Sequence, residues 1–265
     1  MTSGKTSFNL EAGDRPEQDY KRPFLSVIIP AYNEEKRIGL SLRKILDYLQ
    51  ARRFEAEIIV VDDGSSDQTA TLAGEILSDF PDSKIISLPD NKGKGAAVRE
   101  GVLNSKGNLI LFTDADLSTP IEELNKLLPL IGENYEVVIG SRALPGSEIK
   151  KRQGWLREHL GKFFNLLVRL LVLKGFKDTQ CGFKLFKREP AQKIFSRLKT
   201  RGFAFDVEAL LLAQKLGYQI AQVPIVWINY PESRVHLIRS SFRMFLELLR
   251  IKRRKKESFN SRADF

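Results

Sequence analysis

The sequence predicts an α/β protein in which a doubly wound, mostly parallel β-sheet is flanked by helices. Apolar runs of strand length recur as far as about Arg142, and stretches with helical spacing of apolar residues separate them. Two of these runs end in acidic pairs, Asp62-Asp63 and Asp114-Ala-Asp116. Because parallel strands present their carboxyl ends at one edge of a sheet, we expect these acids at the edge where open α/β sheets bind ligands.

The expected elements alternate along a chain of 265 residues, which is long enough for one large domain. Apolar residues at i, i+3 and i+4 spacing predict a helix from Glu34 to about Arg52. Further helices are expected after the capping sequence Ser65-Ser66-Asp67, after the loop Asn91–Ala96, and near Pro120. The expected strands are Leu25–Ile29, Glu57–Val61, Lys84–Leu88, Leu109–Thr113 and Glu136–Gly140.

The pattern changes after Leu144. Residues 160–176 have polar residues at helical spacing beside a wide apolar face, which fits equally a helix buried against the sheet and one lying in a lipid interface. Residues 240–256 place apolar residues beside one polar stripe and end in a basic run, which predicts a helix on an anionic membrane surface. A solvated tail and a nucleic-acid patch are the alternatives. The polar stripe consists of Arg243, Glu247, Arg250 and Arg254.

Composition limits the partners and the compartment. The formal charge of +10 indicates an anionic partner, which is nucleic acid, acidic lipid or a phosphorylated substrate. The single cysteine, Cys181, excludes an intramolecular disulfide and fits a reducing, cytoplasmic compartment. Residues 1–22 are polar and mixed in charge, so we expect a disordered arm there and no signal peptide. No uncharged apolar run is long enough to span a bilayer, so association with the cytoplasmic face of a membrane is expected to be peripheral.

Asp114 and Asp116 follow the strand expected at Leu109–Thr113. Residues two apart in an extended segment point to the same side, so both carboxylates can meet one cation. With no His or Cys nearby, the pair suits Mg²⁺ or Mn²⁺, a hard ion that keeps several waters and binds substrate phosphates. An ordinary solvated turn is the alternative, because Asp-X-Asp alone is a weak motif.

Several ordered motifs carry a resemblance to a known family. They are Pro30-Ala-Tyr-Asn-Glu34, Val61-Asp-Asp-Gly-Ser65, Asp114-Ala-Asp116, Gly140-Ser-Arg142, Asp178-Thr-Gln-Cys-Gly-Phe-Lys-Leu-Phe186 and Phe205-Asp-Val-Glu208. Together they resemble glycosyltransferase family 2. The last two resemble its polyprenyl-phosphate branch, above all the dolichyl-phosphate β-glucosyltransferases, with the dolichyl-phosphate mannose synthases as close relatives.

The resemblance implies a GT-A fold, a single Rossmann-like sheet, over residues 23–239, with residues 240–265 as a basic amphipathic segment at the membrane surface. It implies an inverting transfer of a hexose from a nucleotide-sugar to a polyprenyl or dolichyl phosphate, with Mg²⁺ or Mn²⁺, and UDP-glucose is the expected donor. The alternatives are GDP-mannose as donor, a saccharide hydroxyl as acceptor or, more distantly, a non-enzymatic binder of anionic surfaces. No helix-turn-helix, zinc finger or RNA-binding aromatic motif appears, so nucleic acid is not an expected partner.

The resemblance also implies which residues bind the donor. Asp116 would be the direct metal ligand, and Asp114 would contact the ribose or the metal. Lys94, in a loop that fits either a phosphate cradle or a tight turn, and Arg234 would add positive charge at the diphosphate. Arg234 stands in Glu232-Ser233-Arg234, where the family has Gly-Ser-Lys, so both the loop geometry and the phosphate contact differ. The expected nucleoside pocket consists of Pro30, Tyr32, Glu34 and either Asp62 or Asp63.

The expected acceptor is a phosphate monoester with a second pKa near about 6, so it is already ionised at neutral pH and needs positioning more than deprotonation. Arg142 and Arg157 are expected to clamp this phosphate. Asp178 would orient the sugar or the acceptor, and a role as a general base is possible but less needed. Dolichol enzymes of this type usually carry an amino-terminal membrane helix, which residues 1–22 do not resemble.

Overall fold

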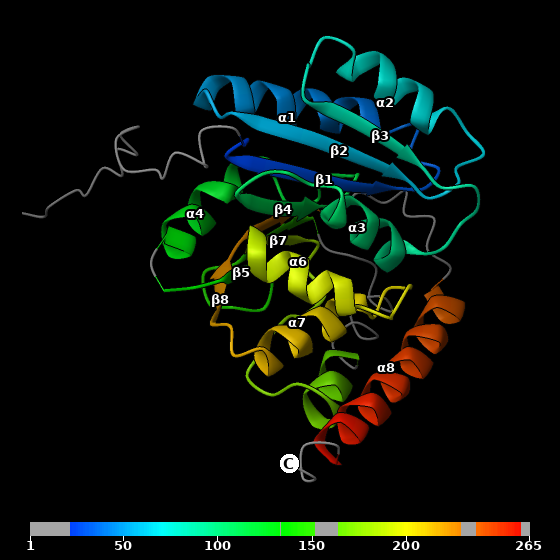
Figure 1. Ribbon diagram of the computed structural model, residues 1–265, viewed down its shortest axis with the longest axis vertical. Helices are drawn as coiled ribbons and strands as arrows, with labels where there is room; N and C mark the ends of the chain where they lie inside the picture. Colours follow the sequence, from blue (N-terminus) through cyan, green and yellow to red (C-terminus); the bar gives the residue numbers. More distant parts are fainter. Residues whose placement is uncertain (1–21, 133, 152–163, 229–236, 261–265) are drawn as a thin grey trace, which may run out of the picture.

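The computed structural model describes residues 22–132, 134–151, 164–228 and 237–260 (Figure 1). Seven strands form the central sheet: β1 (Leu25–Ala31), β2 (Ala56–Asp62), β3 (Ser83–Ser87), β4 (Leu109–Thr113), β5 (Val137–Ser141), β7 (Phe183–Lys187) and β8 (Ile220–Pro224). Their order is β3-β2-β1-β4-β7-β5-β8. β7 runs antiparallel to both of its neighbours, and every other adjacent pair is parallel. The mostly parallel sheet expected from the sequence is therefore confirmed.

Helices cover both faces of the sheet (Figure 1). α1 (Ile38–Arg52), α2 (Thr69–Leu77) and α4 (Leu124–Gly132), which follows a short 3₁₀ turn at Ile121–Glu123, pack on one face. α3 (Lys94–Leu103), α6 (Arg188–Arg197), α7 (Phe205–Lys215) and the long α8 (Leu237–Asn260) pack on the other. A second sheet pairs β6 (Glu148–Lys151) with β9 (Val226–Ile228) in parallel.

The central strands are buried on both faces, which explains why their sequences are almost continuously apolar. In β1, Val27 and Ile29 enter the core beneath α1, α2 and α4, whereas Ile28 enters the core beneath α3, α6 and α7. Leu111 and Phe112 of β4 divide between the two cores in the same way. Burying one such side chain stabilises the fold by about 1.5–3 kcal/mol. The two cores together fix the strand ends, and hence the polar loops that follow them.

α1 begins at Ile38 and not at Glu34, because the preceding residues are held in a turn by the loop after β2. Asn33 has a φ of 55°, a left-handed conformation that Asn adopts more readily than most residues. Its N–H donates to Ser65 Oγ at 2.8 Å, and the N–H of Glu34 donates to Thr69 Oγ1 at 2.7 Å. These hydrogen bonds place Glu34 at the carboxyl edge of the sheet.

The amphipathic segment expected at residues 160–176 is described from residue 164, and residues 164–171 are helical. Phe164, Val168 and Val172 are buried in the core beneath α3, α6 and α7. Leu166 and Leu170 on the other side are 47% and 69% exposed. One side of this helix therefore packs on the protein, and contact of the other side with lipid stays a prediction. Within the described ranges, no helix is both long enough and apolar enough to cross a membrane.

α8 places two members of its predicted polar stripe against the protein. Glu247 accepts a hydrogen bond from the N–H of Gly202, and Arg254 donates one to Thr200 Oγ1. Polar groups of the chain between α6 and α7 need partners, and these two side chains supply them. The stripe is therefore not a uniform water-facing surface. Among the side chains of α8 whose burial the structure describes, the large exposed apolar ones are Phe242, Leu246 and Leu249.

Candidate active site

Loops from five strands bring most of the predicted site residues to one edge of the sheet. Parallel strands β1, β2, β4 and β5 end there, and the antiparallel β7 begins there, so the loop before β7 carries Asp178 to the same place. Charge interactions link Glu34 with Asp116, and Arg142 with both Asp178 and Asp114. Pro30 itself is buried within β1, whereas Tyr32 is 45% exposed at its end.

Arg37, which the sequence did not single out, connects two of these acids. Its Nε and Nη2 donate to the Glu34 carboxylate at 2.7 and 2.6 Å. Its Nη1 lies 3.7 Å from Asp116 Oδ2 and is buried without a hydrogen-bond partner. Burial raises the pKa of Glu34, and the charge of Arg37 opposes that rise only in part. The position of Arg37 three residues after Glu34 was the one available signal, and it is also the spacing of an ordinary surface pair.

The adjacent acids Asp62 and Asp63 have different surroundings. Asp63 accepts hydrogen bonds from the N–H groups of Lys92 and Gly93, both at 2.8 Å, through its two oxygens. Asp62 accepts one from the N–H of Ser65 through Oδ2, whereas its Oδ1 is buried without a hydrogen-bond partner. Because buried polar atoms are normally satisfied, Asp62 Oδ1 is the atom with capacity for a ligand. Asp63 instead fixes the loop that begins α3.

The acidic pair after β4 is held in a tight turn. Asp116 Oδ1 accepts a hydrogen bond from the N–H of Ser118 at 2.9 Å, and the turn passes through Leu117 at a φ of 48°. Such a conformation is rare for a bulky residue and is found where a site constrains the backbone. Burial, with the charge of Asp114 beside it, raises the pKa of Asp116. Lys94 Nζ lies 2.6 Å from Asp114 Oδ1.

Asp114 and Asp116 fit a hard divalent ion by the chemistry of their oxygens. Both side chains are partly open to solvent. Over the parts of the chain that the structure describes, no cluster of three or more His, Cys, Asp or Glu side chains could hold a metal. Mg²⁺ nevertheless needs no such cluster, because it binds through one or two carboxylates together with waters and substrate phosphates. The pair therefore suits an ion that arrives with a phosphorylated ligand.

Gly182, just before β7, makes room for Asp114, since a Cβ there would lie 2.1 Å from Asp114 Oδ2. We expect Gly182→Ala to push the Asp114 carboxylate out of place and to reduce catalytic turnover by up to about 100-fold, because small displacements in a site have large effects on rate. Steady-state kinetics measures this. Gly74→Ala in α2 is the matched control, because nothing lies within 4 Å of its added methyl group. Equal activity of the two variants would contradict the placement of Asp114 in the site.

Arg142, which is partly exposed, forms an ion pair with the buried carboxylate of Asp178. Arg142 Nε and Nη2 donate to the two oxygens of Asp178 at 2.7 and 3.0 Å, and the backbone N–H of Arg142 donates to Oδ2 at 3.1 Å. The N–H of Gln180 donates to Oδ1 at 3.0 Å. Burial would raise the pKa of Asp178, but the charge of Arg142 and these donors outweigh it and lower the pKa to about 2. Asp178 is therefore ionised at neutral pH and orients Arg142. The guanidinium of Arg142 also lies 5.6 Å from the ring centroid of Trp227.

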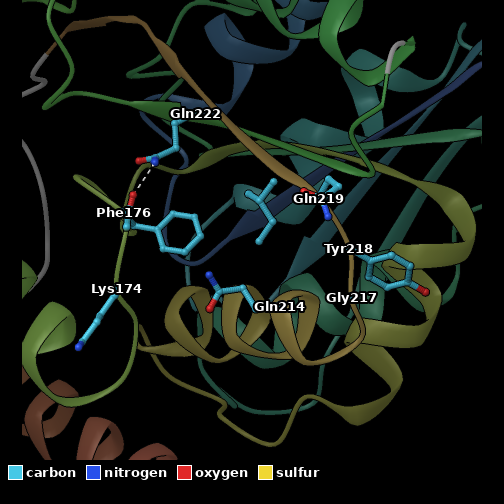
Figure 2. Close-up of a pocket in the computed structure, with 9 residues that line it drawn as sticks. Lys174, Phe176, Gln214, Gly217, Tyr218, Gln219 and Gln222 are labelled. Atoms are coloured by element: carbon cyan, nitrogen blue, oxygen red, sulfur yellow. Dashed lines mark hydrogen bonds between the residues drawn. The ribbon is translucent and has the colours of Figure 1, made fainter.

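Two predicted residues, Arg157 and Arg234, lie outside the described residues. The other predicted site residues, apart from the buried Pro30, place polar side chains at this edge of the sheet. A separate cavity of about 360 Å³ lies between the end of α7 and the start of β8, where Gln222 Nε2 donates to the carbonyl of Gly175 at 2.9 Å (Figure 2). None of the predicted site residues that the structure describes lines it. The candidate site is therefore the open carboxyl edge and not this cavity.

The chain is similar in sequence to known proteins. The sequence profile of glycosyl transferase family 2 matches residues 26–195. The chain is 40% identical over 241 residues to a dolichyl-phosphate beta-glucosyltransferase of Dictyostelium discoideum, covering 86% of this chain and 74% of that protein. It is 40% identical over 243 residues to the protein of the same name from Mus musculus, covering 87% of this chain and 75% of that protein.

A solved structure has the same architecture. It is glucosyl-3-phosphoglycerate synthase from Mycobacterium tuberculosis in complex with Mn²⁺, uridine diphosphate and phosphoglyceric acid. The TM-score is 0.66, the sequence identity is 23%, and the match covers 88% of this chain and 80% of that chain. At this identity the likeness concerns the fold alone, and it confirms the GT-A fold expected from the sequence.

Proposed function

The chain belongs to glycosyltransferase family 2, and from that membership we propose that it transfers glucose from UDP-glucose to dolichyl phosphate. The names of the relatives support the sugar and the acceptor. The uridine diphosphate and Mn²⁺ of the solved neighbour support the donor and a divalent ion. The observation that carries the proposal is the arrangement of the edge, where an acidic pair with an adjacent lysine faces an arginine held by a buried carboxylate.

On the donor side, Asp116 and Asp114 would hold Mg²⁺ or Mn²⁺, which as a Lewis acid stabilises negative charge on the departing nucleoside diphosphate. Burial would lower the pKa of Lys94, but the charge of Asp114 and nearby acids raises it, so this lysine stays a cation and adds to the same stabilisation. Asp62, through its unpaired Oδ1, is the acid that hydrogen-bonds the nucleoside. Pro30, Tyr32 and Glu34 are retained in the proposed nucleoside pocket, and Arg234 is retained at the diphosphate.

On the acceptor side, Arg142 binds the lipid phosphate, with Arg157 retained as a second clamp. A phosphate oxygen attacks the anomeric carbon from the face opposite the leaving group, so the new carbon–oxygen bond forms as the bond to the β-phosphate breaks. UDP leaves with the bonding electrons, and the configuration inverts. The attacking phosphate is already an anion, so no proton has to be removed. Asp178 orients Arg142 and is not a base, because a group with a pKa of about 2 accepts protons poorly at neutral pH.

The acceptor phosphate sets the expected pH dependence. We expect the kcat/KM for the lipid to fall below about pH 6, because the phosphate takes up a proton there and loses nucleophilic charge. Asp178 contributes no limb in this range, since its carboxylate stays ionised down to a pKa of about 2. Rates from pH 5 to 8 test this. A phosphonate acceptor with a higher second pKa should raise the pH at which kcat/KM falls. If that pH does not change, the titrating group belongs to the protein and not to the acceptor.

Peripheral membrane binding is part of the proposal. Phe242, Leu246 and Leu249 form an exposed apolar stripe on α8, with the basic residues Arg243 and Arg250 exposed beside it. An apolar stripe flanked by cations suits an anionic lipid surface, where each basic residue contributes about 1 kcal/mol. This surface would bring the site to a lipid-embedded phosphate at the cytoplasmic face.

A panel of donors and acceptors tests the function. The protein is incubated with Mg²⁺, UDP- and GDP-sugars, and dolichyl phosphate or a free saccharide, and the product is identified by mass. We expect a glucosyl-phosphoryl lipid from UDP-glucose. A mannosyl lipid from GDP-mannose would change the donor, a glycosylated saccharide would change the acceptor, and binding of anionic vesicles without any transfer would remove the enzymatic role.

A further inference from the structure

The chain from Lys199 to Ala204, here called the 199–204 loop, is fastened to α8. Glu247 of α8 accepts hydrogen bonds from the N–H groups of Gly202 and Ala204, both at 3.1 Å. A Cβ at Gly202 would lie 2.3 Å from Glu247 Oε1, so the carboxylate sits directly against the backbone. Ala204 is the residue that precedes α7, so Glu247 caps the start of one helix from the side of another.

A second contact fastens the same loop. Arg254 of α8 donates to Thr200 Oγ1 at 2.9 Å and lies 3.2 Å from Glu208 Oε1 on α7. Glu208 in turn accepts a hydrogen bond from the N–H of Thr200 at 2.6 Å. The loop is therefore held by side chains of both helices.

The other side of the 199–204 loop packs against the start of α3. The carbonyl of Arg201 accepts a hydrogen bond from the N–H of Ala96 at 3.1 Å. A Cβ at Gly93 would lie 2.6 Å from the Arg201 oxygen, and one at Gly95 would lie 2.6 Å from the Thr200 oxygen. Such close contacts transmit a displacement directly, because backbone oxygens of the loop meet glycines and no side chain lies between them to yield.

Lys94 stands between these two glycines, and its Nζ lies 2.6 Å from Asp114 Oδ1. We propose that Glu247 is a positioning residue for Lys94, acting through the 199–204 loop. Glu247 fixes the loop, the loop fixes the first turn of α3, and that turn directs Lys94 at the acidic pair. The inference rests on the proposed function only in assigning Lys94 to the donor diphosphate.

Glu247→Gln tests the proposal, because it keeps the shape of the side chain and removes the charge and one acceptor oxygen. Two measurements are made on the full chain: the affinity for UDP with Mn²⁺ by calorimetry, and hydrogen exchange of residues 91–97 and 199–204. We expect UDP to bind roughly 2- to 30-fold more weakly, the range found for mutations along such a network. Exchange should accelerate in both segments, whereas the KM for a water-soluble short-chain polyprenyl phosphate should stay unchanged.

Glu189→Gln is the matched control, because Glu189 is an exposed carboxylate paired with Lys193 on α6, away from the site. If Glu247→Gln folds too poorly to measure, Arg254→Gln removes the other contact between α8 and the loop. UDP affinity and hydrogen exchange are then measured on that variant. Faster exchange confined to residues 199–204, with unchanged exchange at 91–97 and unchanged UDP affinity, would overturn the proposal. If the wild type makes no glucosyl lipid but the exchange of 91–97 responds as expected, the proposed function fails and the positioning role stands.

Discussion

Asp116→Asn is expected to reduce glucosyl transfer by about 100- to 1,000-fold, the loss typical of removing one group that stabilises developing charge. The stability of the fold should not decrease. Burial raises the pKa of Asp116, so its ionised form is disfavoured in the folded protein, and a neutral amide relieves that cost. Asn can still accept the hydrogen bond from the N–H of Ser118. We therefore expect an unchanged or slightly higher free energy of unfolding in urea.

The control for this variant is Asp79→Asn, which neutralises an exposed carboxylate after α2. It should transfer glucose like the wild type. Transfer by Asp116→Asn within a few-fold of this control, at saturating Mg²⁺, would remove Asp116 from the site. A large loss that extra Mg²⁺ or Mn²⁺ partly reverses would support a role as a metal ligand.

Arg142→Ala is expected to act on both stability and transfer. Asp178 is only 2% exposed, so without Arg142 it becomes a buried charge with no ionic partner. Breaking a buried pair in this way costs about 3–5 kcal/mol of unfolding free energy. The variant also loses the proposed clamp on the acceptor phosphate, so transfer at subsaturating lipid should fall by at least about 100-fold, as for other buried charge contacts to a ligand. Urea unfolding and lipid kinetics measure the two effects.

A double variant separates the two effects of Arg142. In Arg142→Ala with Asp178→Asn, the unpaired charge is gone, so much of the stability should return while transfer stays low. Recovery of transfer together with stability would reduce Arg142 to a structural role.

The pH dependence of the free energy of unfolding is a further check on the pair of Arg142 and Asp178. Asp178 has a depressed pKa in the folded state, so its stabilising contribution is complete above its ordinary pKa of 3.8 and is lost as the pH falls through about 2.

The part of the site that the sequence predicts best is the part governed by parallel strand ends. Asp62, Asp63, Asp114 and Asp116 end or follow apolar runs that were expected to form parallel strands, so their position at the carboxyl edge followed from the predicted fold class. Their individual roles did not follow. The distinction between Asp62 and Asp63 depends on the loop 91–93, which lies far along the chain and hydrogen-bonds one acid and not the other.

The second half of the fold was harder to predict because its strands break the usual pattern. β7 contains Lys184, which is fully buried and donates to Asp206 and to the carbonyl of Cys181. A lysine in an apolar run reads as a surface position unless its buried partner is known. The reversal of β7 between β4 and β5 has no local signal either, yet it brings Asp178 to Arg142. The inward contacts of Glu247 and Arg254 were hidden for the same reason, since helical periodicity does not reveal which polar residues have partners in the protein.

The acidic pair after β4 is proposed to hold the donor diphosphate through a divalent ion. The most direct test is a crystal structure of the protein grown with UDP and Mn²⁺, with the ion located by its anomalous scattering. We expect one Mn²⁺ peak beside the Asp116 carboxylate and the diphosphate of UDP, with Lys94 nearby. UDP bound elsewhere, with Asp116 facing solvent and no ion near it, would contradict the claim.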